Sequence, residues 1–122
     1  MECRIGYVIV GVRELEGALA FYRDVMGFEL LYSAPEFSYA AFRVGDLRFS
    51  IAAGDGDENS TPGSGNRNTG IGFVVADVDA AHGELTTKGV RFTMPPGKQP
   101  WGGYMAMFAD PDGNVFYLDQ AA

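Results

Sequence analysis

"VRELEGA" (residues 12–18) and "VADVDAA" (residues 75–81) are two versions of one short pattern, and they lie 63 residues apart in the chain. Each follows a run rich in β-branched residues. Each also opens a segment whose apolar residues recur at three- and four-residue spacing, which is typical of an amphipathic helix. The segments end at Gly27 and Gly89, and glycine readily adopts the left-handed conformation after a helix. The sequence therefore predicts an internal repeat.

The segments after each helix change to the two-residue period of strands. Three runs in each half show this period: "FELLYSA" (28–34), "SYAAFRV" (38–44), "LRFSIAA" (47–53), "VRFTM" (90–94), "GGYMAMFA" (102–109) and "NVFYLDQ" (114–120). Turn formers separate the last two runs of each half, "GD" at 45–46 and "DPDG" at 110–113. Each half thus reads β-α-β-β-β, and the predicted fold class is α+β with two βαβββ modules.

The boundaries of this arrangement follow from composition. We predict one domain over residues 1–122, with module 1 at about 4–53, a linker at about 54–68 and module 2 at about 69–120. The linker is rich in polar turn formers, which predicts an exposed, mobile segment. One helix covers only one face of a four-stranded sheet. We expect the modules, related by a pseudo-twofold axis, to form an open cup-like mixed sheet with the helices outside. The alternative is that the second face of each sheet is simply an interface filled with side chains and encloses no cavity.

Composition narrows the function classes. Nine basic against sixteen acidic residues give a net charge of −7, so nucleic acid is not an expected partner, and a cationic ligand is favoured. The chain has no apolar run of eighteen residues and no signal-peptide pattern, which predicts a cytoplasmic protein without a membrane partner. Cys3 is the single cysteine and cannot form an internal disulfide.

Three segments carry a resemblance to a known family: "VRELEGALAFYRDVMGFEL", "FVVADVDAAHGELTTKGVRF" and "PWGGYMAMFADPDGNVFYL". Together with the repeat they cover nearly the whole chain. In this order the chain resembles the vicinal oxygen chelate superfamily, the glyoxalase, bleomycin-resistance and extradiol-dioxygenase group. The resemblance implies paired βαβββ modules and, in the enzymes of the group, a divalent metal held by histidine or glutamate on the first and last strands of a module.

Carried onto this chain, the four ligand positions fall at Tyr7, at Gly70, near Ser50 and at Tyr117. None of these is a usual ligand for a divalent ion, which requires imidazole, carboxylate or thiolate groups. The only histidine, His82, lies in the second predicted helix and has an expected structural or surface role. We therefore expect no metal and no cofactor at this site.

Strand alternation predicts which side chains line the cup. The candidate ligand-binding residues are Tyr7, Ile9, Tyr39, Arg48, Ser50, Gly70, Trp101, Tyr104 and Tyr117. Trp101 and Tyr104 are candidate stacking or lid residues, since the resemblance puts their loop at the mouth of the cavity. Arg43 and Arg48 are candidate anchors for a carboxylate. The catalytic residues are not identified.

Three functional hypotheses follow. The first is a protein that binds a small organic molecule in the cup without a catalytic metal, like the antibiotic-sequestering members of the group. The second is a metal-dependent lyase or dioxygenase with atypical ligands, for which Asp119, Glu29, Glu36 and Asp46 are spare carboxylates. The third is a metal-free catalyst with Tyr7 or Tyr117 as general acid or base. The resemblance and the open sheet edges also predict a homodimer.

Overall fold

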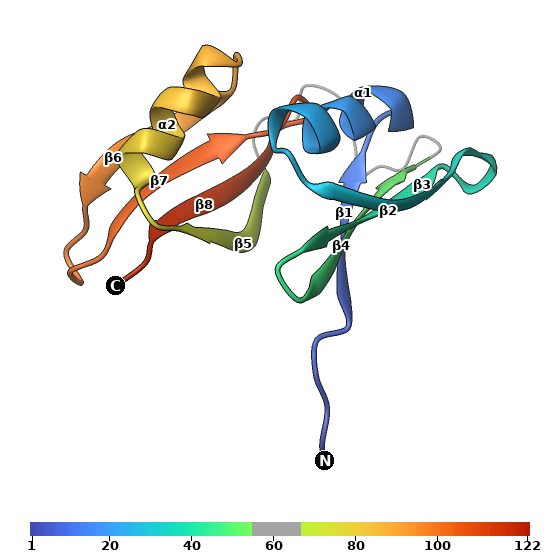
Figure 1. Cartoon of the computed structure of the whole chain (residues 1–122), viewed down its shortest axis with the longest axis horizontal. Helices are drawn as coiled ribbons and strands as arrows, with labels where there is room; N and C mark the ends of the chain where they lie inside the picture. Colours follow the sequence, from blue (N-terminus) through green and yellow to red (C-terminus); the bar gives the residue numbers. More distant parts are fainter. Residues whose placement is uncertain (55–66) are drawn as a thin grey trace. The chain divides into compact units, whose positions relative to one another are not determined.

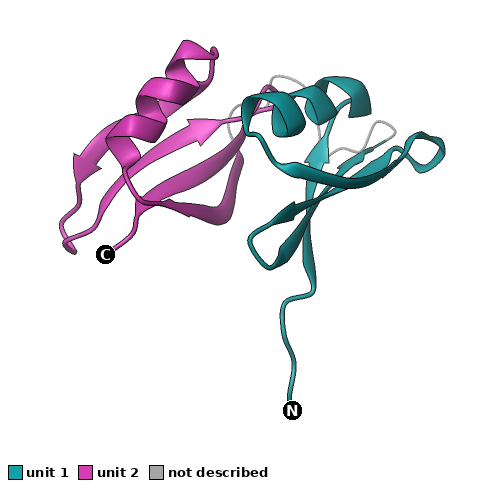
Figure 2. Ribbon diagram, viewed as in Figure 1, with its two compact units in different colours: residues 1–64 teal, residues 65–122 magenta. Residues whose placement is uncertain are grey.

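The computed structural model describes residues 1–54 and 67–122, which belong to two compact units, residues 1–64 and 65–122 (Figure 2). Each unit is one βαβββ module with a four-stranded mixed sheet, so the predicted α+β fold class is confirmed. Most of the predicted linker, residues 55–66, lies outside the described residues. The cup predicted from both modules stays a prediction, and each module is described by itself below.

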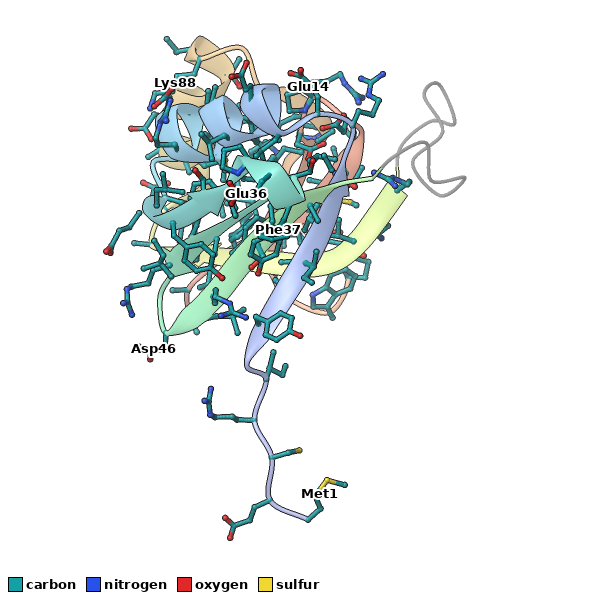
Figure 3. All side chains as sticks on the ribbon, turned by 90° about the vertical axis from the view of Figure 1, so that its right-hand side faces the viewer. Met1, Glu14, Glu36, Phe37, Asp46 and Lys88 are labelled. Atoms are coloured by element: carbon teal, nitrogen blue, oxygen red, sulfur yellow. The ribbon has the colours of Figure 1, made fainter. Side chains whose placement is uncertain are left out.

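Module 1 has a sheet with strand order β1-β4-β3-β2, in which β1 and β4 run parallel and the other neighbours antiparallel (Figure 1). Its elements are β1 (Tyr7–Val12), α1 (Leu15–Ala20), the π-helical turn η1 (Phe21–Val25), β2 (Glu29–Ala34), the 3-10 turn η2 (Pro35–Phe37), β3 (Tyr39–Val44) and β4 (Leu47–Ala53). Figure 3 shows that the segment from Met1 to β1 is extended.

The helical segment of module 1 consists of α1 followed directly by η1 and ends at Val25, two residues before the predicted stop at Gly27. Glu14 is its N-cap, and its carboxylate accepts a hydrogen bond of 2.9 Å from the Gly17 amide. The helix then widens into η1, where the Met26 amide donates to the Phe21 carbonyl at 2.9 Å. Gly27 follows with φ +74°, which confirms the predicted glycine stop.

The core of module 1 is an aromatic cluster between this helix and one face of the sheet. Tyr22 has no exposed surface, and its ring lies 5.1 Å from Phe49 and 6.2 Å from Phe42 between centroids. Phe28 packs edge-on against the same two rings. The helix-facing side of the sheet is therefore fully occupied by packing.

Module 2 repeats the arrangement with strand order β5-β8-β7-β6. Its elements are β5 (Arg67–Val75), α2 (Val78–Thr87), β6 (Arg91–Lys98), β7 (Tyr104–Ala109) and β8 (Asn114–Gln120). Asp77 caps α2 by accepting a 3.1 Å hydrogen bond from the Ala80 amide, and Gly89 ends it with φ +89°. Strand β5 begins at Arg67, whereas module 2 was predicted to begin at about residue 69. The last two residues assigned to the linker therefore belong to this strand.

The core of module 2 is again aromatic. Phe108 and Phe116 are fully buried with centroids 5.5 Å apart, and Phe73 packs on both. His82 lies edge-on to Phe92 of β6, with 4.5 Å between ring centroids, so its ring contacts the sheet.

The turn between β7 and β8 is held by a buried carboxylate. The Gly113 amide donates to the Asp110 carbonyl at 3.0 Å, which closes the predicted turn. The Asp110 carboxylate accepts from the amides of Asp112 and Asn114 and from the Asn114 side chain, at 2.8 to 2.9 Å. Asn114 in turn accepts a 2.8 Å hydrogen bond from Arg67 at the start of β5.

Among the described residues, no helix is long and apolar enough to cross a membrane.

Candidate binding face and its relatives

Five of the predicted site residues share the face of module 1 that points away from α1. Tyr7 and Ile9 on β1 lie beside Arg48 and Ser50 on β4, and Tyr39 lies on β3. Alternation explains this placement. The residues at the alternate positions of these strands point to the helix side, and Val10, Phe49 and Ile51 among them are buried there. We call Tyr7, Ile9, Tyr39, Arg48 and Ser50 the module 1 open face. Tyr7 and Ile9 are about half exposed, at 51% and 52%.

A pair of hydroxyl groups marks one end of the module 1 open face. The Tyr39 hydroxyl donates a 2.7 Å hydrogen bond to Ser50 Oγ. The Tyr39 ring also lies 6.0 Å from the ring of Tyr32 on β2. Ala41 is directly opposite both Ser50 and Tyr32 in the sheet, so a small side chain lies between larger ones.

The two candidate arginine anchors differ in their surroundings, although they are direct neighbours across β3 and β4. Arg43 is exposed and forms an ion pair with Glu29, with Nε 3.6 Å from Oε1. Arg48 instead lies over the Tyr7 ring, with Cζ 4.6 Å from the ring centroid, and its buried Nε has no hydrogen-bond partner. Of the two, only Arg48 has a buried donor nitrogen without a hydrogen-bond partner among the described residues.

Gly70 does not occupy the position that the constant repeat offset predicts. Tyr7 is opposite Arg48 in module 1, and the corresponding place in module 2, opposite Val115, is taken by Asn68. The reason is a bulge in β5: Asn68 and Gly72 are four residues apart, whereas their partners Val115 and Tyr117 are two apart. Gly70 lies within the bulge with φ +74°, and its amide donates to Asn68 Oδ1 at 2.9 Å.

Tyr117 lies on the open face of module 2 and is hydrogen-bonded. Asn68 Nδ2 donates to its hydroxyl at 2.7 Å. The neighbours of Tyr117 in the sheet are Gly72 and Met107, and Asp119 follows two residues later on the same face. This face thus offers one phenol, one carboxylate and a thioether, without an arginine at these positions.

Tyr104 points to the opposite side of its sheet, which corrects its prediction as a stacking or lid residue. Its neighbour Met105 is opposite Asp119, so Tyr104 faces α2, where its hydroxyl donates a 2.6 Å hydrogen bond to Asp79 Oδ1. That hydrogen bond is the main reason why the pKa of Tyr104 is raised above its usual 10.0, with desolvation and the charges of Asp79 and Asp77 adding to it.

Trp101 lies in the loop between β6 and β7 and is 70% exposed. Its indole Nε1 is 2.9 Å from the place that a Cβ on Gly103 would take, so this glycine allows the ring to lie against the loop. The role of Trp101 as a lid stays a prediction. Phe37, labelled in Figure 3, lies in η2 between β2 and β3 and is 78% exposed.

The residues at the expected ligand positions do not fit a divalent metal ion. Ser50 and Tyr117 offer neutral oxygens that already accept hydrogen bonds, and Asn68 and Tyr7 supply neither imidazole nor carboxylate. Within residues 1–54 and 67–122, no group of three histidine, cysteine, aspartate or glutamate side chains is placed to hold an ion.

Sequence reasoning missed two residues that complete these contacts, Asn68 and Asp79. A signal for Asn68 was present in "NTG", because an asparagine side chain readily bonds the amide two residues later and favours a turn there. Asp79 had a weaker signal, since acidic residues are common in the first helical turn for reasons unrelated to a tyrosine.

The fold, together with the pairing of the site residues in the two sheets, defines a two-module α+β protein of the type that the repeat predicts. The sequence profile of the Glyoxalase/Bleomycin resistance protein/Dioxygenase superfamily matches residues 4–118, and the chain belongs to this superfamily. A search of curated proteins found no matching relative.

Solved structures agree with the fold. A member of the same superfamily from Sphaerobacter thermophilus is 29% identical, with a TM-score of 0.83 over 98% of both chains. A lactoylglutathione lyase from Agrobacterium tumefaciens is 22% identical, with a TM-score of 0.77 over 99% of this chain and 96% of that one. The fosfomycin resistance protein FosX from Listeria monocytogenes has the same identity and TM-score over 100% and 96%. At 22% identity, the last two show the fold alone.

Proposed function

We propose that this protein binds a small organic molecule on the module 1 open face and needs no catalytic metal ion to do so. The observation that carries the proposal is the mixture of groups on that face. Half-exposed Tyr7 and Ile9 provide apolar contact, while the partly buried Tyr39 and Arg48 provide polar groups; Ser50, to which Tyr39 donates a hydrogen bond, is itself fully buried. Ligand sites are typically apolar surfaces with a small number of placed polar groups.

The helix-facing side of the same sheet makes a useful contrast. It is filled by the packed rings of Tyr22, Phe42 and Phe49. Exposed apolar side chains on the opposite face have no such packing role in module 1, and grouped exposed apolar residues commonly mark a binding surface. Superfamily membership is consistent with a binding protein. A homodimer and a cytoplasmic location remain part of this proposal.

Nuclear magnetic resonance titration with a library of small aromatic and alicyclic compounds tests the proposal. We expect saturable amide shifts in β1, β3 and β4 and none in α1. Ile9→Ser should weaken the best binder by about fivefold, because a contact of about 1 kcal/mol is lost. Leu31→Ser is the matched control, since Leu31 is an exposed apolar residue of the β2 irregularity outside the face, and it should change affinity less than twofold.

Two results would contradict the proposal. A library in which no compound shifts the β1 and β4 amides would remove the binding function. Stoichiometric zinc, nickel, iron or manganese in untagged protein purified without chelator would favour the metal-dependent lyase or dioxygenase instead.

A further inference from the structure

We propose that Arg48 makes the module 1 open face selective for organic anions, namely a carboxylate or related anionic group on a flat apolar body. This inference rests on the binding function proposed above and adds the charge of the ligand. It runs against the chain as a whole, whose net charge of −7 favours cations at long range. The charges close to Arg48 favour an anion at this position instead.

The position of the Arg48 side chain suits a carboxylate. The Tyr7 ring lies against the guanidinium, 4.6 Å from Cζ to centroid, and this contact restrains the plane of the group. The guanidinium Nε is buried and has no hydrogen-bond partner among the described residues. A carboxylate commonly bridges two neighbouring guanidinium nitrogens, so it matches the forked donors of this group.

The charge of Arg48 is not neutralised by the residues that the structure describes. Its neighbours across the sheet are Tyr7 and Arg43, and neither carries a negative charge. The carboxylate nearest along this row, Glu29, is opposite Arg43 and pairs with it at 3.6 Å. An anion at Arg48 therefore competes with no ion pair of the described residues, whereas an anion at Arg43 would compete with Glu29.

The rest of the face fits an apolar body with one further polar group. Tyr7 and Ile9 flank Arg48 and Ser50 in the sheet and offer half-exposed apolar surface. Ser50 accepts the hydrogen bond that Tyr39 donates but has no exposed surface, so the partly buried Tyr39 is the further polar residue of this face.

Three probes with the same naphthalene body test the charge preference: 2-naphthoate, neutral 2-naphthamide and cationic 2-naphthylmethylammonium. Titration calorimetry of the full chain at fixed salt should give an affinity order of anion, amide and cation, with about tenfold between the first two. Arg48→Gln should remove this tenfold preference, because it removes the charge that distinguishes the anion from the amide. Arg43→Gln is the matched control, because it removes an adjacent positive charge of the same strand pair. It should leave the preference within twofold of wild type.

The outcomes separate this inference from the proposed function. If the probes bind the face but the amide or the cation binds as tightly as the anion, the anion selectivity is wrong and the binding function stands. If the preference survives in Arg48→Gln, Arg48 is not its source and the inference is equally wrong. If none of the probes binds, the anion selectivity is wrong, and the library titration described above decides the binding function separately. Should Arg48→Gln fail to fold, the wild-type affinity order and Arg48→Lys, which keeps the charge but not the fork, decide the question.

Discussion

Module 1 buries Phe42 and Phe49 beneath α1, and module 2 buries Phe108 and Phe116 beneath α2, with the same strand order in both. The opposite faces have little in common. Module 1 presents Arg48 and the Tyr39 hydroxyl, whereas module 2 presents the phenol of Tyr117, the carboxylate of Asp119 and the thioether of Met107. The repeated side is the side that holds the helix, because packing rings between helix and sheet tolerates few alternatives. The open faces carry no such packing constraint, and their side chains differ between the modules.

The largest expected effect tests whether the two cores are equivalent. Phe108→Ala should destabilise the protein by about 3–5 kcal/mol, because it removes a fully buried ring from the Phe73–Phe116 cluster. Phe42→Ala, the same change in module 1, should cost a similar amount. Urea unfolding followed by far-ultraviolet circular dichroism measures both. A cost under about 1.5 kcal/mol for either one would break the equivalence.

The second test concerns the last hairpin of each module. Asp110→Ala should destabilise by about 2–3 kcal/mol, because three donors lose a buried acceptor. Asp46→Ala, in the exposed turn at the equivalent place in module 1, should stay within about 0.5 kcal/mol. Thermal unfolding compares the two variants. Equal losses would show that the Asp110 network adds nothing beyond a turn.

The third test concerns the bulge that distinguishes β5 from β1. Gly70→Ala should cost about 1–2 kcal/mol, because alanine disfavours a φ of +74°. Gly72→Ala is the control, since no positive φ is found there and its Cβ would make ordinary contacts of 3.4 Å and 3.5 Å. It should change stability by less than about 0.5 kcal/mol. If the two glycines behave alike under denaturant, the bulge is not required.

The smallest effect is a titration. Tyr104 should ionise above its usual pKa of 10.0, because its neutral hydroxyl donates to Asp79. The raised pKa means that this contact stabilises the fold below the usual tyrosine pKa and is lost as the pH rises through the raised value. Ultraviolet absorbance titration, with Tyr104→Phe to assign the signal, measures it.

Asp79→Asn provides the control for that titration. It should bring the pKa of Tyr104 back toward 10.0, because the charged acceptor is removed. An unchanged pKa in Asp79→Asn would mean that the hydrogen bond is not formed in solution.

Much of the fold was predictable because helix stripes, caps and turn residues are local signals. Strands β4 and β8 have the predicted bounds, and both glycine stops adopt positive φ. The bulge in β5 was not predicted, since an asparagine and a glycine beside a polar stretch indicate a turn as well as a strand irregularity. The π-helical turn at Phe21–Val25 has no sequence signal of comparable strength.

The candidate site was predictable where alternation is unambiguous. On β1 and β4 it placed Tyr7, Ile9, Arg48 and Ser50 on one face. On β7 the residues of both parities are apolar, so the period alone does not say which face Tyr104 takes. Its shared parity with Phe108, a core ring, is the clue that decides. The different surroundings of Arg43 and Arg48 depend on contacts between strands, which no local pattern reports.

The bulge in β5 has a consequence for how a duplicated protein diverges. Two additional residues are taken up between Asn68 and Gly72, and beyond that point the pairing of β5 with β8 follows the pairing of β1 with β4. A length change near the start of a strand is thus confined to the first residue pairs of that strand. It does not reach the helix that follows. The start of β5 is therefore a place where a strand accommodates additional residues while its later pairs keep their register.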